Sequence, residues 1–169
     1  FIEQSGTVTF DGTTAQSLTA ETYYNLVINN TVTTPTDTSD VDSSASVTVT
    51  NNLTVTDGQF QPQDTSSFKH ITIASAGILK PDSSTTLNVS GNWNNQGGTF
   101  TPNLGTINLN AVSGTPTLTS GGNAFHHLTL NDANSNITFT LQDALDINRN
   151  LTITGGTLNT GTNYSVNLA

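Results

Sequence analysis

A 14-residue pattern recurs three times without a gap in this chain of 169 residues. Each copy has two apolar residues around a variable one, then an Asn followed by an apolar residue, and a Gly six residues after the Asn. The copies are Val47–Phe60, Leu87–Phe100 and Leu145–Leu158, with Asn52, Asn92 and Asn150 in one role and Gly58, Gly98 and Gly156 in another. Recurrence of a short unit is typical of proteins that stack similar modules, so this repeat constrains the fold more than any other feature.

Apolar residues alternate with polar ones along most of the chain, which indicates strands with one buried face. Nine apolar pairs recur at a mean step close to 20 residues, about one coil of a parallel β-solenoid, whereas a sandwich has turns about every 8–12 residues. No window shows a helical stripe. The sequence therefore predicts one all-β domain over residues 1–169, a right-handed parallel β-helix of about nine coils without significant helix. The pairs are Val8/Phe10, Leu26/Ile28, Leu53/Val55, Ile71/Ile73, Leu87/Val89, Ile107/Leu109, Leu128/Leu130, Leu151/Ile153 and Val166/Leu168.

A longer repeat lies over the coils, because segments near the start match segments about 100 residues later. It divides the chain into blocks 1–99 and 100–169, the second incomplete. Residues 31–46, rich in Pro, Ser, Thr and Asp, are predicted to form a projecting loop. The Asn of each 14-residue copy suits a sharp corner, because Asn tolerates left-handed backbone and stacked amides can form ladders. The Gly suits a second corner, where a positive φ costs little.

The composition excludes several partners. Only 9% of the residues are charged, and the net charge is −9 with Lys69, Lys80 and Arg149 as the only Lys or Arg residues. Nucleic acids and anionic membrane surfaces need clustered cations, so neither is expected as a partner. No apolar run approaches the ~20 residues of a membrane span, and we expect no membrane insertion. The absence of Cys and Met suits exposure to oxidants outside the cell.

The segments NLTVTDG, NLTITGG and SGNWNNQGGTF carry a resemblance to a known class of proteins. The chain resembles the secreted right-handed β-helix repeat proteins of bacterial surfaces, of the filamentous-haemagglutinin and autotransporter-passenger type. That resemblance implies export to the extracellular space or cell surface, a rigid rod, and a role in adhesion or assembly.

The two ends of the chain suggest a structural function. The chain begins in mid-repeat, with Val8 and Phe10, and ends on the apolar alternation of Val166 and Leu168 without a polar cap. Uncapped coils offer strand edges to another chain. We therefore expect copies of the protein to assemble head-to-tail into a filament. The alternative is that both ends are cut points within one longer repeat protein.

Two sets of residues suggest binding instead. Asp37, Asp40 and Asp42 form the densest acidic group, which gives a weak candidate site for Ca²⁺, although Asp is also common in solvated turns. Tyr23, Tyr24 and Trp93 can form a sugar-stacking platform in a carbohydrate-binding adhesin, or can simply cap the core. No other cofactor is expected.

Catalysis and ice binding are further alternatives. A polysaccharide lyase needs a cation to stabilise a carbanion, and only Lys69 and Lys80 are near one another in sequence. A glycosidase needs two paired carboxylates, for which Asp143 and Asp146 are the nearest candidates. The adjacent pair His126-His127 points to opposite faces of an ideal strand and cannot bind one ion without a bend. Thr-x-Thr triplets resemble those of ice-binding solenoids, but Thr also fills outward strand positions generally. The sequence predicts a non-enzymatic structural protein.

Overall fold

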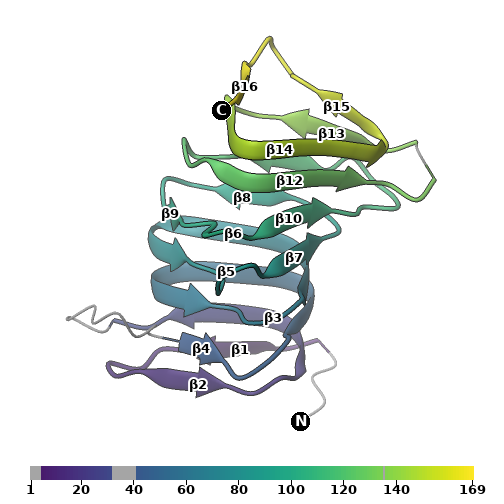
Figure 1. Ribbon diagram of the computed structural model, residues 1–169. Coiled ribbons are helices and arrows are strands. Elements are labelled where there is room, and N and C mark those ends of the chain that lie inside the picture. The colour runs from purple at the N-terminus through teal and green to yellow at the C-terminus, as the bar shows by residue number, and fades with distance from the viewer. Residues whose placement is uncertain (1–4, 32–40, 135) are drawn as a thin grey trace.

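The computed structural model describes residues 5–31, 41–134 and 136–169 of the chain (Figure 1). These residues form sixteen β-strands and no helix, and all of the strands belong to one sheet. The strands are β1 (Thr7–Phe10), β2 (Gln16–Leu18), β3 (Thr22–Asn29), β4 (Val41–Ser43), β5 (Thr48–Gln61), β6 (Ser66–Leu79), β7 (Thr86–Val89), β8 (Trp93–Asn95), β9 (Thr99–Phe100), β10 (Thr106–Leu109), β11 (Thr117–Thr119), β12 (Phe125–Asn131), β13 (Thr138–Leu141), β14 (Leu145–Gly155), β15 (Thr157–Asn159) and β16 (Val166–Leu168). The described residues therefore contain no helix long and apolar enough to cross a membrane.

Every strand pairing among these residues is parallel, and each turn of the chain lies on the turn before it (Figure 1). The strand β5 illustrates the winding, because successive parts of it pair at Val49 with β3, at Leu53 with β3 further along, and at Phe60 with β4. The sheet therefore wraps around three faces. We define the first, second and third faces as those that contain Val49, Leu53 and Phe60. The predicted all-β parallel solenoid is confirmed.

The solenoid has about seven turns rather than the predicted nine. On the second face, a column of paired residues runs Val8, Leu26, Leu53, Ile71, Trp93, Leu118 and Leu141. The apolar pairs that begin at Leu87 and end at Leu151 belong to the first face instead, and Val166 pairs with Leu145 on the third. The two shortest steps between successive apolar pairs are the 16 residues from Ile71 to Leu87 and the 15 residues from Leu151 to Val166. Each of these steps is therefore a change of face and not a full turn. The right-handed winding stays a prediction.

The first two copies of the 14-residue pattern lie in register, and the third is displaced by one face. Leu53 is aligned with Trp93 through Ile71, two turns apart. Leu151, at the equivalent position of the third copy, is aligned through Leu128 with the column of Leu87 on the first face. Asn150 therefore lies beside His127 and not in line with Asn52 and Asn92.

The predicted loop over residues 31–46 is too long at its C-terminal end. Residues 32–40 lie outside the described residues, but Val41–Ser43 is the strand β4, paired with β2 and β5. Val41 and Ser43 are both buried. The strand β4 has only three residues, and its second inward side chain is the small hydroxyl of Ser43. Its composition therefore resembles that of a turn, which explains why the sequence predicted a loop here.

The corners use residues other than those predicted. Gly58 and Gly156 have positive φ, at 75° and 84°, as expected, but Gly98 does not, and Asn51 and Asn52 do not adopt left-handed backbone. Non-glycine residues with positive φ occur instead at Asp64, Ser84, Asn103 and Asn163. The Asn corner is turned by a register shift in the sheet between Val49 and Asn52.

The core is a continuous stack of inward aliphatic side chains with an aromatic group near its middle. Trp93 is fully buried and contacts Phe100 and Phe125, with ring centroids 4.7 and 5.2 Å apart. Aromatic rings that meet edge-to-face add about 0.5–1.5 kcal/mol beyond the area that they bury.

Candidate functional site

The terminal turns have strands that are paired on one side only within the described residues. At the N-terminal end, β1 pairs only with β3, and β2 only with β4. At the C-terminal end, β15 pairs only with β13, and β16 only with β14. The unpaired strands on the second and third faces at one end therefore match those at the other end, and all run in the same parallel sense (Figure 1).

Apolar side chains of the C-terminal turn are exposed where their counterparts one turn inward are buried. Ile153 is 50% exposed, whereas Leu130, with which it pairs, is fully buried. Leu168 is 59% exposed, whereas Ile147, with which it pairs, is 1% exposed. The same core columns that would be covered by a further turn thus reach solvent here.

The predicted assembly residues lie at these two ends. Val8 and Phe10 are partly buried in β1 at the N-terminal end, and Val166 is partly buried in β16 at the C-terminal end beside Leu168. Leu151 and Leu158 complete the C-terminal apolar surface, and both are partly buried against the core. The structure brings the predicted residues together at each end.

A corner ladder, defined by Asn25, Asn52, His70 and Asn92, joins successive turns along one edge of the second face. Asn25 Oδ1 accepts a hydrogen bond from the backbone N–H of Asn52 at 3.3 Å, and His70 Nδ1 accepts one from the N–H of Asn92 at 3.0 Å. Asn92 Oδ1 accepts from the N–H of Thr117 on the next turn at 3.1 Å. The predicted stack of asparagines is present only in part, because His70 lies between Asn52 and Asn92 and Asn150 belongs to another column. The hydrogen bonds of the corner ladder run from backbone N–H groups to side chains.

The pKa of His70 lies below its usual value, because burial disfavours the imidazolium and the nearby Lys69 charge adds to this effect. Its Nδ1 is therefore held as a hydrogen-bond acceptor, which the bond from Asn92 requires. The sequence did not place His70 in the ladder, because the step from Asn52 to His70 is not part of the 14-residue pattern.

The first face presents a flat row of hydroxyl and amide side chains. The row contains Thr22, Thr48, Ser67, Asn88, Asn108, Thr129 and Thr152. Asn108 Nδ2 donates a hydrogen bond to Asn88 Oδ1 at 2.8 Å, so neighbouring members of the row contact one another. Thr is replaced by Ser or Asn at three successive positions, which interrupts the regular threonine array expected for ice binding.

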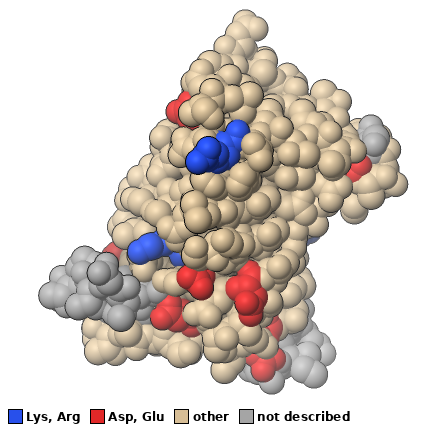
Figure 2. All heavy atoms as spheres, viewed as in Figure 1, with Lys and Arg blue, Asp and Glu red and all other residues tan. Residues whose placement is uncertain are grey.

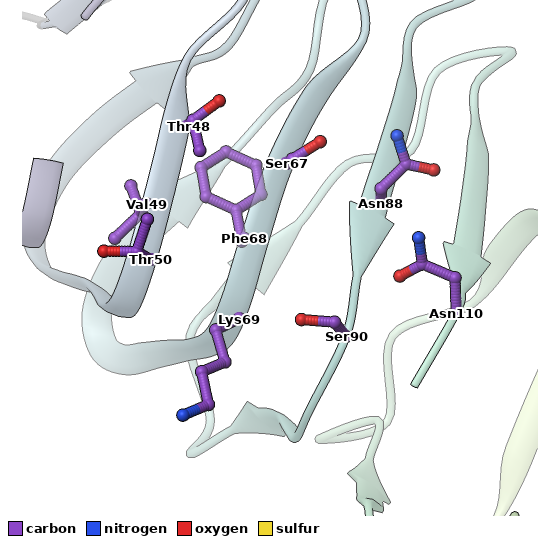
Figure 3. Close-up of a pocket in the computed structure, with 9 residues that line it drawn as sticks. All are labelled: Thr48, Val49, Thr50, Ser67, Phe68, Lys69, Asn88, Ser90 and Asn110. Atoms are coloured by element: carbon purple, nitrogen blue, oxygen red, sulfur yellow. The ribbon is translucent and has the colours of Figure 1, made fainter. Parts of the chain in front are cut away.

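An open hollow of about 320 Å³ lies on this face (Figure 3). It is lined by Thr48, Val49, Thr50, Ser67, Phe68, Lys69, Asn88, Ser90 and Asn110. Figure 3 shows Thr48 and Thr50 on one side of the hollow and Asn88 and Asn110 on the other. The Oδ1 atom of Asn110 is buried and has no hydrogen-bond partner within the described residues.

The predicted aromatic platform does not form. Tyr23 is 4% exposed and Trp93 is fully buried, so their ring faces pack in the core, and Tyr24 alone of the three is partly exposed. Sugar stacking needs exposed ring faces, so Tyr23 and Trp93 are core residues, as in the alternative that the sequence left open. Of the Ca²⁺ candidate, Asp37 and Asp40 lie outside the described residues and Asp42 is on β4, so that site stays a prediction.

The two lysines considered for catalysis lie on different faces, and each of the two carboxylates is hydrogen-bonded to a neighbouring turn. Lys69 lies in the first-face hollow, whereas Lys80 follows Leu79 on the third face. Asp143 accepts backbone hydrogen bonds from Ser120 and Gly121, each at 2.7 Å, and so closes a turn. Asp146 accepts from Asn167 Nδ2 at 2.6 Å.

The histidine pair differs from the prediction, because a register shift in β12 between Phe125 and His127 supplies the bend that an ideal strand lacks. Both imidazoles are partly exposed, and their ring centroids lie 4.5 Å apart. Burial, His127 and the Arg149 charge together lower the pKa of His126. We call His126, His127 and Arg149 the basic corner.

Asp132 is a buried carboxylate that the sequence did not single out. It is 2% exposed and accepts hydrogen bonds from the backbone N–H groups of Asn134 at 3.0 Å, Asn136 at 2.5 Å and Ile137 at 2.6 Å. Burial raises its pKa, but the three hydrogen bonds lower the pKa more, so the net pKa lies below its usual value. An Asp that opens a polar loop is the available signal for such a turn.

Comparisons with protein-family models, with curated proteins and with solved structures found no match to this chain.

Proposed function

We propose that this protein is a structural, non-enzymatic subunit of an extracellular or cell-surface filament, in which copies join head-to-tail through their terminal turns. The observation that carries the proposal is the exposure of Ile153 and Leu168, whose paired residues in the preceding turn, Leu130 and Ile147, are buried. A further turn from another copy would cover these side chains and pair the open strands β15 and β16 with β1 and β2.

Two physical terms favour such a junction. Covering the exposed half of one Leu or Ile side chain contributes roughly 1 kcal/mol, since full burial is worth about 1.5–3 kcal/mol. Parallel pairing at the open strands also satisfies backbone groups, as in β-augmentation. The extracellular location is supported by the absence of oxidisable sulfur and by the resemblance to secreted β-helix proteins.

Sedimentation velocity and electron microscopy of the purified chain test the proposal. We expect end-to-end oligomers whose length grows with protein concentration. Leu168→Asp places a charge in the junction and should shift the chain to monomers. Leu104→Asp is the matched control, because Leu104 is also 59% exposed but lies away from both terminal turns. A chain that stays monomeric at high concentration, or equal effects of the two variants, would refute the proposal.

Glycan binding is a second candidate function, now centred on the first-face hollow. Asn88, Ser90 and Asn110 line the hollow and supply polar side chains that can form hydrogen bonds with sugar hydroxyls. Binding on a glycan array that is lost in Asn110→Ala would support this candidate. Binding that survives the substitution would count against the hollow.

A further inference from the structure

Charged side chains are distributed unevenly along the rod. The chain contains only three Lys or Arg residues, and Arg149 lies on β14 in the C-terminal turn, beside His126 and His127 on β12. Figure 2 shows few blue atoms on the viewed side, with red atoms gathered mainly toward the N-terminal half. Glu21 lies in that half, immediately before β3.

Glu21 and Arg149 occupy the same corner at opposite ends. The register of the first face connects Thr22 through five intervening strands to Thr152. Glu21 directly precedes Thr22 and is therefore equivalent in register to Leu151, which precedes Thr152. Arg149 stands two residues before Leu151, so both charged residues lie near the point where the chain passes from the third face to the first. Neither residue forms an ion pair within the described part of the chain.

We propose that the basic corner at the C-terminal end of one copy receives Glu21 of the next copy, and that this contact sets the rotational register of the junction. The inference rests on the head-to-tail assembly proposed above. In a copy stacked with its faces aligned, Glu21 lies one or two strand spacings from Arg149, about 5–10 Å along the axis, and is offset by two residues, about 7 Å, along the strand direction. The two extended side chains together can cover that separation.

The contact between opposite charges would select one rotational register of the junction, which the apolar contact alone does not. All three faces offer parallel strand edges with similar side chains, so apolar and backbone terms distinguish poorly between a correct stack and one rotated by one face. A rotated stack would leave Glu21 away from the basic corner. Opposite charges at the rim of an interface fix register and speed association more than they add affinity.

Charge reversal tests the contact in the full chain. Arg149→Glu and Glu21→Arg should each weaken end-to-end association about tenfold or more at low ionic strength, and the double variant should recover most of the loss. Salt should reduce the difference between wild type and either single variant, because the pair is solvent-exposed. Lys69→Glu, which makes the same charge change away from the ends, should associate like the wild type.

The outcomes separate the two proposals. If the wild type assembles but the single variants assemble equally well, or the double variant recovers nothing, the corner contact is wrong and the filament stands. If the wild type does not assemble at any concentration, both proposals are overturned. Unchanged melting temperatures of the variants show that the fold is intact.

Discussion

Replacing Gly98 by alanine tests how closely successive turns approach one another. A Cβ atom at Gly98 would lie 2.2 Å from the backbone oxygen of Ala74 and 2.8 Å from that of Gly77, both in the preceding turn. The backbone of Gly98 is not left-handed, so the substitution introduces no φ strain. Gly77 has the same relation to the turn before it, since its Cβ would lie 2.2 Å from the oxygen of Val55.

The magnitude follows from which atoms must move. Ala74 and Gly77 belong to β6, which is paired with neighbouring turns on both sides, so their carbonyl groups cannot yield as a flexible side chain can. Overpacking usually costs 1–3 kcal/mol, and a backbone obstacle places Gly98→Ala at about 3 kcal/mol. For a chain of this length that corresponds to a melting temperature lower by roughly 6–12 °C.

Thermal unfolding followed by circular dichroism measures the effect. Gly12→Ala is the control, because the three atoms nearest to the added Cβ all belong to the side chain of Gln16. It should lower the melting temperature by no more than a few degrees. Equal melting temperatures for Gly98→Ala and Gly12→Ala would refute the close approach between turns.

Two pH-dependent effects follow from the buried acceptors. For His70 the folded pKa is lowered, so the free energy of unfolding should fall as the pH drops below the unfolded pKa of about 6.5. The variant His70→Asn keeps an acceptor at the Nδ1 position and should remove this pH dependence, as measured by urea unfolding between about pH 7 and 5. For Asp132 the folded pKa is also lowered, so its contribution to the stability of the fold should be complete above the unfolded pKa of about 3.9 and should be lost as the pH falls further. The variant Asp132→Asn should lower the melting temperature at about pH 7, and its melting temperature should decrease less steeply below about pH 4. A His70→Asn variant that keeps the full slope, or an Asp132→Asn variant as stable as wild type at pH 7, would contradict the respective assignment.

The fold class could be predicted because parallel stacking imposes the same alternation on every strand. The mean step of about 20 residues gave the coil length with small error. The number of turns could not be predicted, because the three faces share one apolar-polar-apolar pattern. Leu87 and Ile71 look equivalent in sequence, although one is on the first face and the other on the second.

The binding residues were predicted less well. The repeat itself contained the signal that Trp93 is buried, because Trp93 takes the position of Leu53 in the first copy. For His126 and His127 the sequence predicted side chains on opposite faces of the strand, whereas a local register shift brings the two imidazoles together on the surface. Such a shift needs only one additional residue in a strand and has no distinctive sequence pattern.

The scarcity of charge follows from the stacking itself. In a parallel, in-register solenoid each outward side chain stands about 4.8 Å from its equivalents in the turns on either side, where like charges repel. In the paired registers Asp42 lies beside Ser17 and Gln61, and Asp57 beside Asn29 and Ala76, so each carboxylate has neutral neighbours. Thr, Ser and Asn can repeat along a column without this penalty, and Asn gains amide hydrogen bonds from it. The contact proposed between Arg149 and Glu21 of the next copy pairs opposite charges, so it would be exempt from this repulsion.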